Sequence, residues 1–242
     1  MRTIWDGVQW LVDPDNWGGR NGIGRAVLQH LWYSLVATVV AVAIGLPIGL
    51  AVGHTGRGRL VVANITGVWR AIPTVGVVTI VYRWQPLSVW PVLVALVILA
   101  IPPIVLNTVA GLDSVPHEVR DAARGMGLTG WQELWHVEVP NGLPLILAGI
   151  RSAANQVIAT ATIAGFVGLG TLGVFMFSAS ATQRYDVLAG ASIAVIAIVL
   201  LVEALFAVLQ RTIVSEGVRA RAPRRMRAVG TVPTGVATES GA

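Results

Sequence analysis

The chain has 242 residues, of which 55% are hydrophobic and only 12% are charged. Soluble globular proteins carry about a quarter charged residues, so this composition, with a mean hydropathy of +0.71, indicates an integral membrane protein. The net charge of +5 comes from arginines scattered between apolar runs, which excludes the basic face of a soluble nucleic-acid-binding domain. Cysteine is absent, which excludes disulfides, thiol catalysis and cysteine metal sites.

Residues 1–25 differ from the rest of the chain because charged residues alternate with apolar ones. Apolar residues recur at helical spacing from Ile4 to Val12, with tryptophans nearby. This pattern is typical of a short amphipathic helix in the membrane interface, and the Asp13–Pro14 pair is expected to end it.

Several segments are long and apolar enough to cross a membrane, which takes about 20 mostly apolar residues. Five such spans are predicted, at about residues 28–52, 61–82, 89–110, 140–167 and 187–208. The chain is therefore predicted to be an all-α polytopic membrane protein with one transmembrane domain at 26–213. Residues 214–242 lack a periodic apolar pattern and are predicted to be a disordered tail.

Arginine is distributed unequally between the two sides of these spans. Ten arginines follow the first, third and fifth spans, and five fall on the opposite side. Because positive charge in short loops marks the cytoplasmic side, the N-terminus is predicted outside and the C-terminus inside. The polar segment at 111–140 is then cytoplasmic, in a multi-pass protein of a prokaryotic cell membrane.

That segment contains DAARGMGLTGWQELWHVEVP, residues 121–140, a polar island between apolar spans. Pro116 and Glu118 favour the start of a helix, and Gly127 can adopt the left-handed turn that ends it. Small residues around this bend would let another protein approach closely. The island is therefore predicted to hold a helix–turn–helix elbow at the membrane surface.

The second half of the elbow, TGWQELWHVEV, is predicted to be a short amphipathic helix. Its spacing places Trp131, Leu134 and Trp135 on one face. Pro140 cannot continue an established helix, but it suits the beginning of the next one.

The island resembles the EAA loop of ABC importer permeases, which is Glu-Ala-Ala, three residues, Gly, nine residues, then Ile-x-Leu-Pro. Every spacing matches, and aspartate replaces the glutamate while valines replace the isoleucine and leucine. The matching positions are Asp121, Ala122, Ala123, Gly127, Val137, Val139 and Pro140.

The resemblance covers about residues 25–213. IPPIVLNTVAGLDSVP before the island and LPLILAGIRSAANQVIATATIAGFVGLGTLG after it are similar to the osmoprotectant branch of this family. WRAIPTVGVV resembles that branch's Gln-Thr-Ile-Pro-Ser segment, with Arg70 where glutamine is usual.

The resemblance implies a type I ABC importer fold and a function in the uptake of glycine betaine, choline, carnitine or proline betaine. It implies that two permease subunits, identical or different, form the pathway within the lipid. Two cytoplasmic ATPases drive transport, and an external solute-binding protein delivers the solute. The loop at 111–140 would couple to the ATPase, with Asp121 facing a basic partner. The chain itself would have no catalytic residues and no cofactor.

Polar residues inside the predicted spans are candidates for a pathway or a structural role, since charges there are costly. Arg70 lies within the second span. Arg151 lies about 16 Å and Glu203 about 12 Å from the cytoplasmic side at 1.5 Å per residue, so the two can form a buried ion pair. The pair could be structural or part of a gate. Asn155, one turn from Arg151, could line the pathway or bridge helices.

Other motifs carry no chemistry in this context. GLGTLG at 168–173 matches G-x-G-x-x-G, but a membrane span precedes it, so it is predicted to be a glycine-rich break. No metal-ligand spacing, Walker A sequence or nucleophile–base pair is present. Most tryptophans fall near span ends, as interface anchors do.

Two other transport functions remain open. One is the permease subunit of an amino-acid importer of the methionine type, which would have the same elbow. The other is a stand-alone secondary carrier, which would be expected to contain internal repeats and would leave the elbow without a role. An intramembrane enzyme is disfavoured by the absence of a nucleophile–base or metal-ligand pair.

Overall fold

The computed structural model describes residues 2–62, 64, 76, 77, 79, 80, 83 and 88–213. In these residues the regular structure is helical, and the predicted all-α class is confirmed. The predicted site residue Arg70, most of the predicted second span and the tail at 214–242 lie outside the described residues. The helices are α1 (Arg2–Val12), α2 (Ile23–Thr55), α5 (Trp90–Asp113), α6 (His117–Gly125), α7 (Gly130–Glu133), α8 (Val139–Ala161), α9 (Leu172–Ala181) and α10 (Tyr185–Ile213).

Within the described ranges, four helical segments are long and apolar enough to cross a membrane. They are α2, α5, the segment Gly130–Val167 that contains α8, and α10. They correspond to the predicted first, third, fourth and fifth spans. A helix satisfies its own backbone hydrogen bonds, which lipid cannot do, so apolar runs of this length are helical.

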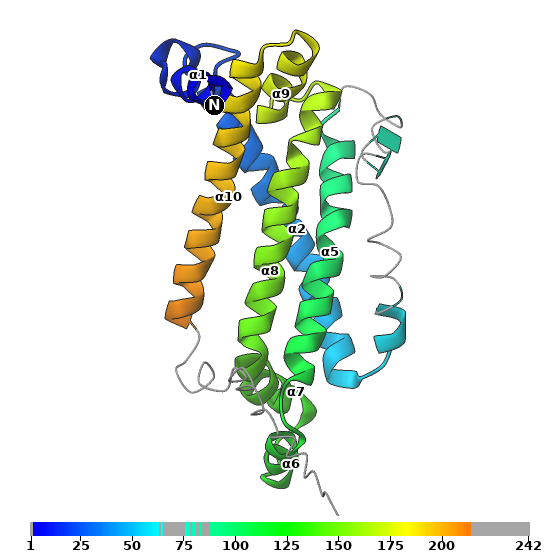
Figure 1. The fold of residues 1–242 in the computed structure, drawn as a ribbon. Helices are drawn as coiled ribbons and strands as arrows, with labels where there is room; N and C mark the ends of the chain where they lie inside the picture. The colour runs from blue at the N-terminus through cyan, green and yellow to red at the C-terminus, as the bar shows by residue number, and fades with distance from the viewer. Residues whose placement is uncertain are drawn as a thin grey trace, which may run out of the picture.

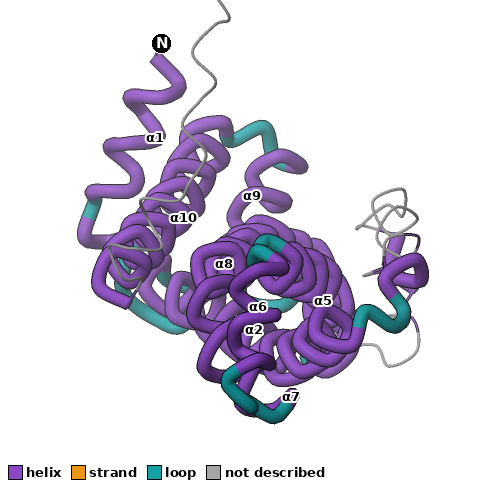
Figure 2. Tube along the Cα trace, turned by 90° about the horizontal axis from the view of Figure 1, so that it is seen from below, coloured by secondary structure: helices purple, strands orange, loops and turns teal. Residues whose placement is uncertain are grey.

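The core lies where α2, α5 and α8 run side by side (Figures 1 and 2). Small side chains line these contacts, since alanines 37, 41, 95, 100, 153 and 161 are almost completely buried. Small residues let membrane helices approach closely and gain dispersion contacts that lipid would otherwise provide. These three helices therefore form the framework that carries the polar loop.

α1 and α9 lie at the opposite end of the bundle from α6 and α7, and α1 packs against α10 (Figure 1). Gly7 allows this approach, because a β-carbon there would lie 2.7 Å from Ala189 Cβ. The helix ends at Val12, as predicted, and Asp13 accepts a hydrogen bond of 3.1 Å from the Asp15 N–H to begin a short 3-10 turn. The predicted interfacial helix is thus fixed to the last span.

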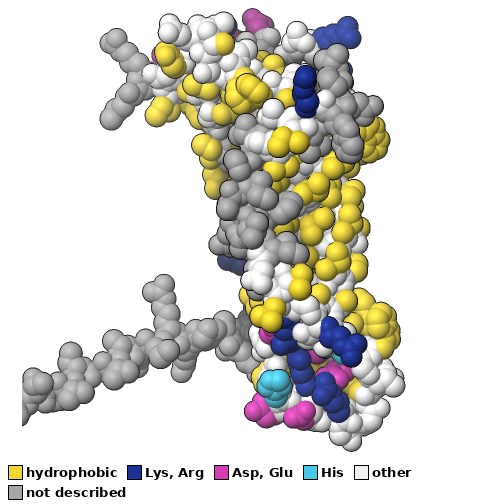
Figure 3. Space-filling view, turned by 90° about the vertical axis from the view of Figure 1, so that its right-hand side faces the viewer, with side chains coloured by type: hydrophobic (Ala, Val, Ile, Leu, Met, Phe, Trp, Pro, Cys, Tyr) yellow, Lys and Arg dark blue, Asp and Glu magenta, His cyan; other side chains and the backbone are white. Residues whose placement is uncertain are grey.

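The two ends differ in charge from the body between them. In Figure 3 hydrophobic side chains line one long flank of the molecule, and arginine, acidic and histidine side chains gather at the end that carries α6 and α7. Exposed tryptophans mark both ends, with Trp5 and Trp90 at one and Trp131 at the other. This distribution suits a membrane-spanning body with polar ends.

Candidate functional site

The polar loop, residues 111–140, connects α5 to α8 and contains two short helices joined by a tight turn. α6 is followed by Gly127, whose φ of +84° lies in the left-handed region. Gly127 N–H donates to Arg124 O at 2.9 Å and Leu128 N–H donates to Ala123 O at 3.2 Å. These two bonds form a Schellman motif, which closes the carbonyl end of the helix. The predicted left-handed turn at Gly127 is therefore confirmed.

The next helix begins with a capping box. Thr129 Oγ1 accepts from Gln132 N–H at 3.4 Å, and Gln132 Oε1 accepts from Thr129 N–H at 2.9 Å. Both ends of the turn thus have their backbone groups satisfied. The sequence determines this geometry through Gly127, Thr129 and Gln132.

Pro140 lies in the first turn of α8, as the sequence predicted. A π-helical stretch at Leu134–Glu138 joins α7 to α8, and Val139 N–H bonds to Leu134 O, one residue further back than in an α-helix. This wider turn receives Pro140, which has no N–H to donate, at the beginning of α8. α7, the π-helical stretch and α8 therefore form one continuous helical rod.

The two alanines of the motif face opposite ways, so only one of these small side chains near the bend is open to a partner. Ala123 is buried, together with Arg120 on the same side of α6. Asp121 and Ala122 are exposed. A helix places residues three apart on one face, so the packing of Arg120 against the bundle determines that Ala123 also points inward.

The predicted apolar face of Trp131, Leu134 and Trp135 is also divided. The two tryptophans are exposed and form an edge-to-face pair with ring centroids 5.6 Å apart. Leu134 is buried in a cluster with Leu50 and Leu112. The apolar side of this short helix therefore both anchors it to the bundle and leaves an aromatic pair at the membrane boundary.

An ion pair holds the two short helices together. Arg124 Nε and Nη2 donate to the carboxylate of Glu133 at 2.9 and 3.1 Å. Glu133 is buried, and the hydrogen bond and negative charge that it offers raise the pKa of Arg124 above its usual range. The bidentate geometry fixes the angle between α6 and α7.

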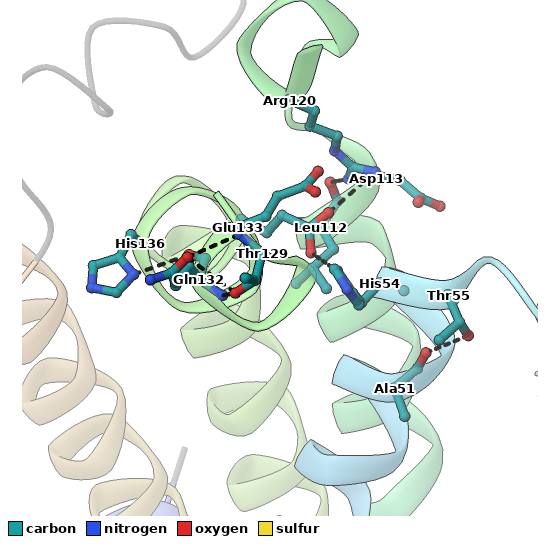
Figure 4. A network of polar contacts seen from close by, with 12 residues as sticks. Ala51, His54, Thr55, Leu112, Asp113, Arg120, Thr129, Gln132, Glu133 and His136 are labelled. Carbon is teal, nitrogen blue, oxygen red and sulfur yellow. Dashed lines mark hydrogen bonds and ion pairs between the residues drawn. The ribbon is translucent and has the colours of Figure 1, made fainter. Parts of the chain in front are cut away.

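A second group of charges, which sequence reasoning missed, joins the loop to the bundle. Glu138 is completely buried. Its Oε2 lies 2.6 Å from His54 Nδ1 at the end of α2, and its Oε1 lies 3.3 Å from Arg120 Nη1. Arg120 also donates to Leu112 O at the end of α5. Figure 4 shows His54, Leu112 and Arg120 converging from three helices on this junction.

The remaining motif residues lie along the junction with α8. Val137 and Val139 are half-buried, and Pro140 is exposed. Of these three, Val139 packs against the buried cluster of Leu50, Leu112, Leu134 and Ile146.

The structure brings together the polar residues predicted within the spans. Arg151 Nη2 lies 3.1 Å from Glu203 Oε1, and Asn155 Nδ2 donates to Glu203 Oε2 at 2.8 Å. Arg151 and Glu203 side chains are 35% and 38% exposed, so the pair is not fully buried by this chain. α10, which carries Glu203, has the smallest buried share of the four long apolar helices described above, 11% of its span.

The glycine run at 168–173 forms a break between helices. A 3-10 turn at Ile163–Val167 ends at Gly168, whose φ is +83°, and α9 then begins at Leu172. In the described part of the chain, no group of three or more His, Asp or Glu residues is placed to hold a metal ion. The polar loop is therefore the candidate functional site.

Comparison with known proteins bears on the family and the fold of the chain. A family model described as "Binding-protein-dependent transport system inner membrane component" matches residues 42–216. The carnitine transport permease protein OpuCB of Listeria monocytogenes is 34% identical over 175 residues, which are 72% of this chain and 80% of that protein. The osmoprotectant import permease protein OsmW of Salmonella typhimurium is 30% identical over 231 residues, which cover 88% of this chain and 100% of that protein.

The fold is also known from solved structures. An inward-facing structure of the MetNI methionine ABC transporter superposes with a TM-score of 0.68 and 22% identity, covering 80% of this chain and 96% of that one. At this identity the likeness concerns the fold, which is that of a type I ABC importer membrane subunit. The match over residues 42–216 extends through the polar loop and the spans on both sides of it, and the chain belongs to the family of inner-membrane components of binding-protein-dependent transport systems.

Proposed function

We propose that this chain is the permease subunit of an ATP-driven importer of compatible solutes such as carnitine, choline and glycine betaine. The observation that carries the proposal is the polar loop, in which a fixed elbow presents an acidic, small-residue face away from the bundle. The relatives are named for carnitine, osmoprotectant, choline and glycine betaine transport, which supports the solute class.

The loop supports docking to a separate ATPase subunit. Four residues of α6 at helical spacing are exposed and form one face, which we call the docking face: Glu118, Asp121, Ala122 and Gly125. Its carboxylates suit a basic groove, and Ala122 and Gly125 let the helix enter that groove closely. The aspartate reaches about one methylene less far than the glutamate of the family motif.

The partners follow from this arrangement. Two cytoplasmic ATPases would close on ATP and move the elbows of a permease pair, and the spans would then open alternately to either side. An external solute-binding protein would deliver the solute. The chain would bind and move the solute without catalysing a reaction.

Transport by the assembled complex tests the function. Proteoliposomes containing this chain with its ATPase and binding protein are expected to take up labelled carnitine, choline or glycine betaine. Uptake should require ATP on the side of the membrane where the ATPase lies. Labelled methionine serves as the comparison solute. Uptake of methionine alone would favour the methionine-type importer, and ATP-independent uptake driven by an ion gradient would favour a secondary carrier.

The proposed orientation places the polar loop in the cytoplasm and the N-terminus outside. Within the described residues, Arg57, Arg59, Arg120 and Arg124 belong to the loop end, in agreement with the positive-inside tendency. α1 lies at the opposite end (Figure 1).

A cysteine-labelling experiment tests this orientation, because the chain has no cysteine of its own. Met126 and Trp5 are 75% and 65% exposed at opposite ends. A membrane-impermeant thiol reagent is expected to label Trp5→Cys in intact spheroplasts, and Met126→Cys only after permeabilisation. Labelling of Met126→Cys in sealed spheroplasts would reverse the proposed orientation.

A further inference from the structure

Glu138 occupies an unusual place for a carboxylate, at the junction of the polar loop with the membrane rod. The exposed fraction of Glu138 is 0%, although its side chain is ionisable. Its Oε2 lies 2.6 Å from His54 Nδ1, a contact in which an ionised carboxylate accepts from the Nδ1–H tautomer of the histidine. A buried charge needs a partner of opposite sign, and Glu138 Oε1, which accepts no hydrogen bond in the described part of the chain, has the ion pair with Arg120 Nη1 at 3.3 Å.

The partners of Glu138 come from elements that are far apart in sequence. His54 lies one residue before the end of α2 and is 84 residues from Glu138. Arg120 belongs to α6, and the same guanidinium donates to Leu112 O at the end of α5. Glu138 therefore connects the polar loop to the ends of α2 and α5, besides its covalent connection to α8.

Glycine contacts independently fix the same three helices at the same end. A β-carbon at Gly49 would lie 2.6 Å from Thr108 Cβ, which joins α2 to α5. A β-carbon at Gly111 would lie 2.8 Å from Gly142 O, which joins α5 to α8. Backbones this close have no intervening layer of flexible side chains, so the helix ends can move together but cannot slide freely past one another.

We propose that Glu138 is a positioning residue for coupling, which makes the ends of α2 and α5 follow the movement of the polar loop. The rod formed by α7 and α8 carries the movement into one helix by covalent continuity. The hydrogen bond of Glu138 with His54 and its ion pair with Arg120 carry the movement into the ends of α2 and α5. This inference rests on the proposed function, because it assumes that an ATPase moves the loop.

The experiment compares transport with ATP hydrolysis in the reconstituted wild-type complex and in a Glu138→Gln variant. The amide keeps the shape and one acceptor but removes the charge that holds Arg120. We expect the number of solute molecules taken up per ATP to fall by roughly fivefold or more, a typical size for coupling between two sites. ATP hydrolysis itself is expected to continue.

A second variant removes only the connection to α2. His54 is 24% exposed, so His54→Ala leaves Glu138 paired with Arg120 and disturbs packing less. It is expected to lower the same ratio in the assembled complex. The control is Asp186→Asn, the same charge-to-amide change in the ion pair with Arg184 at the other end, which should leave the ratio unchanged.

A covalent bridge separates coupling from stability. His54→Cys combined with Glu138→Cys provides the only thiols of this chain, and a short bifunctional thiol reagent can join them. The unbridged variant should have a low ratio, and the bridge should restore it toward the wild-type ratio. A bridge that arrests uptake would mean that the contact opens during transport, and this would overturn the proposal.

Two further results have distinct meanings. If both Glu138→Gln and His54→Ala lower only the amount of subunit and leave solute taken up per ATP unchanged, Glu138 is merely structural and the proposal is wrong. If the wild-type complex shows no ATP-dependent uptake, the proposed function fails before the role of Glu138 is measured.

Discussion

Replacement of Ala122 by tryptophan should abolish ATP-driven uptake while the subunit continues to reach the membrane in normal amount. Ala122 is exposed at the centre of the docking face. Because Ala122 is exposed in the described structure, the indole overfills no packed contact there, and its lower helix propensity costs about 0.5 kcal/mol. It would, however, hold the elbow away from the groove of the ATPase. We expect co-purified ATPase to fall by roughly tenfold or more, which corresponds to about 1.4 kcal/mol of docking free energy.

Ala123 provides the matched control because it is the next residue with the opposite orientation. Its side chain is 1% exposed, so Ala123→Trp overfills the contact between α6 and the bundle. Such overpacking costs about 1–3 kcal/mol, and we expect a less stable and less abundant subunit. The measurements are subunit abundance, thermal stability in detergent and bound ATPase. Normal ATPase binding by Ala122→Trp would show that the docking face lies elsewhere.

The elbow could be predicted from sequence because its geometry depends on neighbouring residues. The left-handed turn needs a residue without a β-carbon, and Gly127 is placed for it. The orientation of the two alanines could not be predicted in the same way. It depends on Arg120 packing against α5, which is a contact between elements and leaves no local pattern.

Glu138 was missed for the same reason. It stands between two valines in a segment with an apolar pattern, and its partner His54 lies at the end of another helix. No spacing rule connects residues that are this far apart. Pro140 correctly predicted the beginning of α8, but the π-helical turn that joins α7 to it was missed, because a widened turn has no local sequence pattern.

The contact between Arg151 and Glu203 could be inferred because residues on different membrane helices can be compared by their depth in the membrane. Counting residues from the cytoplasmic side at about 1.5 Å each placed both charges at similar depth. Depth does not determine rotation about the helix axis, which the structure supplies. The structure also shows that Asn155 contacts this pair, because its amide donates a hydrogen bond to the second carboxylate oxygen of Glu203.

Removing either Arg151 or Glu203 should lower the stability of the subunit more than the other substitutions proposed above. An unpaired charge at the centre of a membrane helix costs about 2.5–3.5 kcal/mol, and breaking a buried pair costs about 3–5 kcal/mol. Because both side chains are more than a third exposed within this chain, the lower range applies. Arg151→Ala and Glu203→Ala are each expected to reduce subunit abundance, and the thermal stability of the purified protein should fall.

The charge swap distinguishes a specific pair from two separate polar residues. Arg151→Glu together with Glu203→Arg keeps one charge of each sign at the same depth, so the double variant should recover part of the stability that either reversal loses. Asn155 can accommodate the swap, because its Oδ1 has no partner in the described part of the chain and can accept from the arginine placed at position 203.

Abundance, thermal stability and uptake of the wild type, the two single reversals and the double variant give a double-mutant cycle. Additive losses would mean that the two charges act independently. Recovery of stability without recovery of uptake would place Arg151 in the pathway as well as in the pair, because only a pathway residue requires its charge at that position.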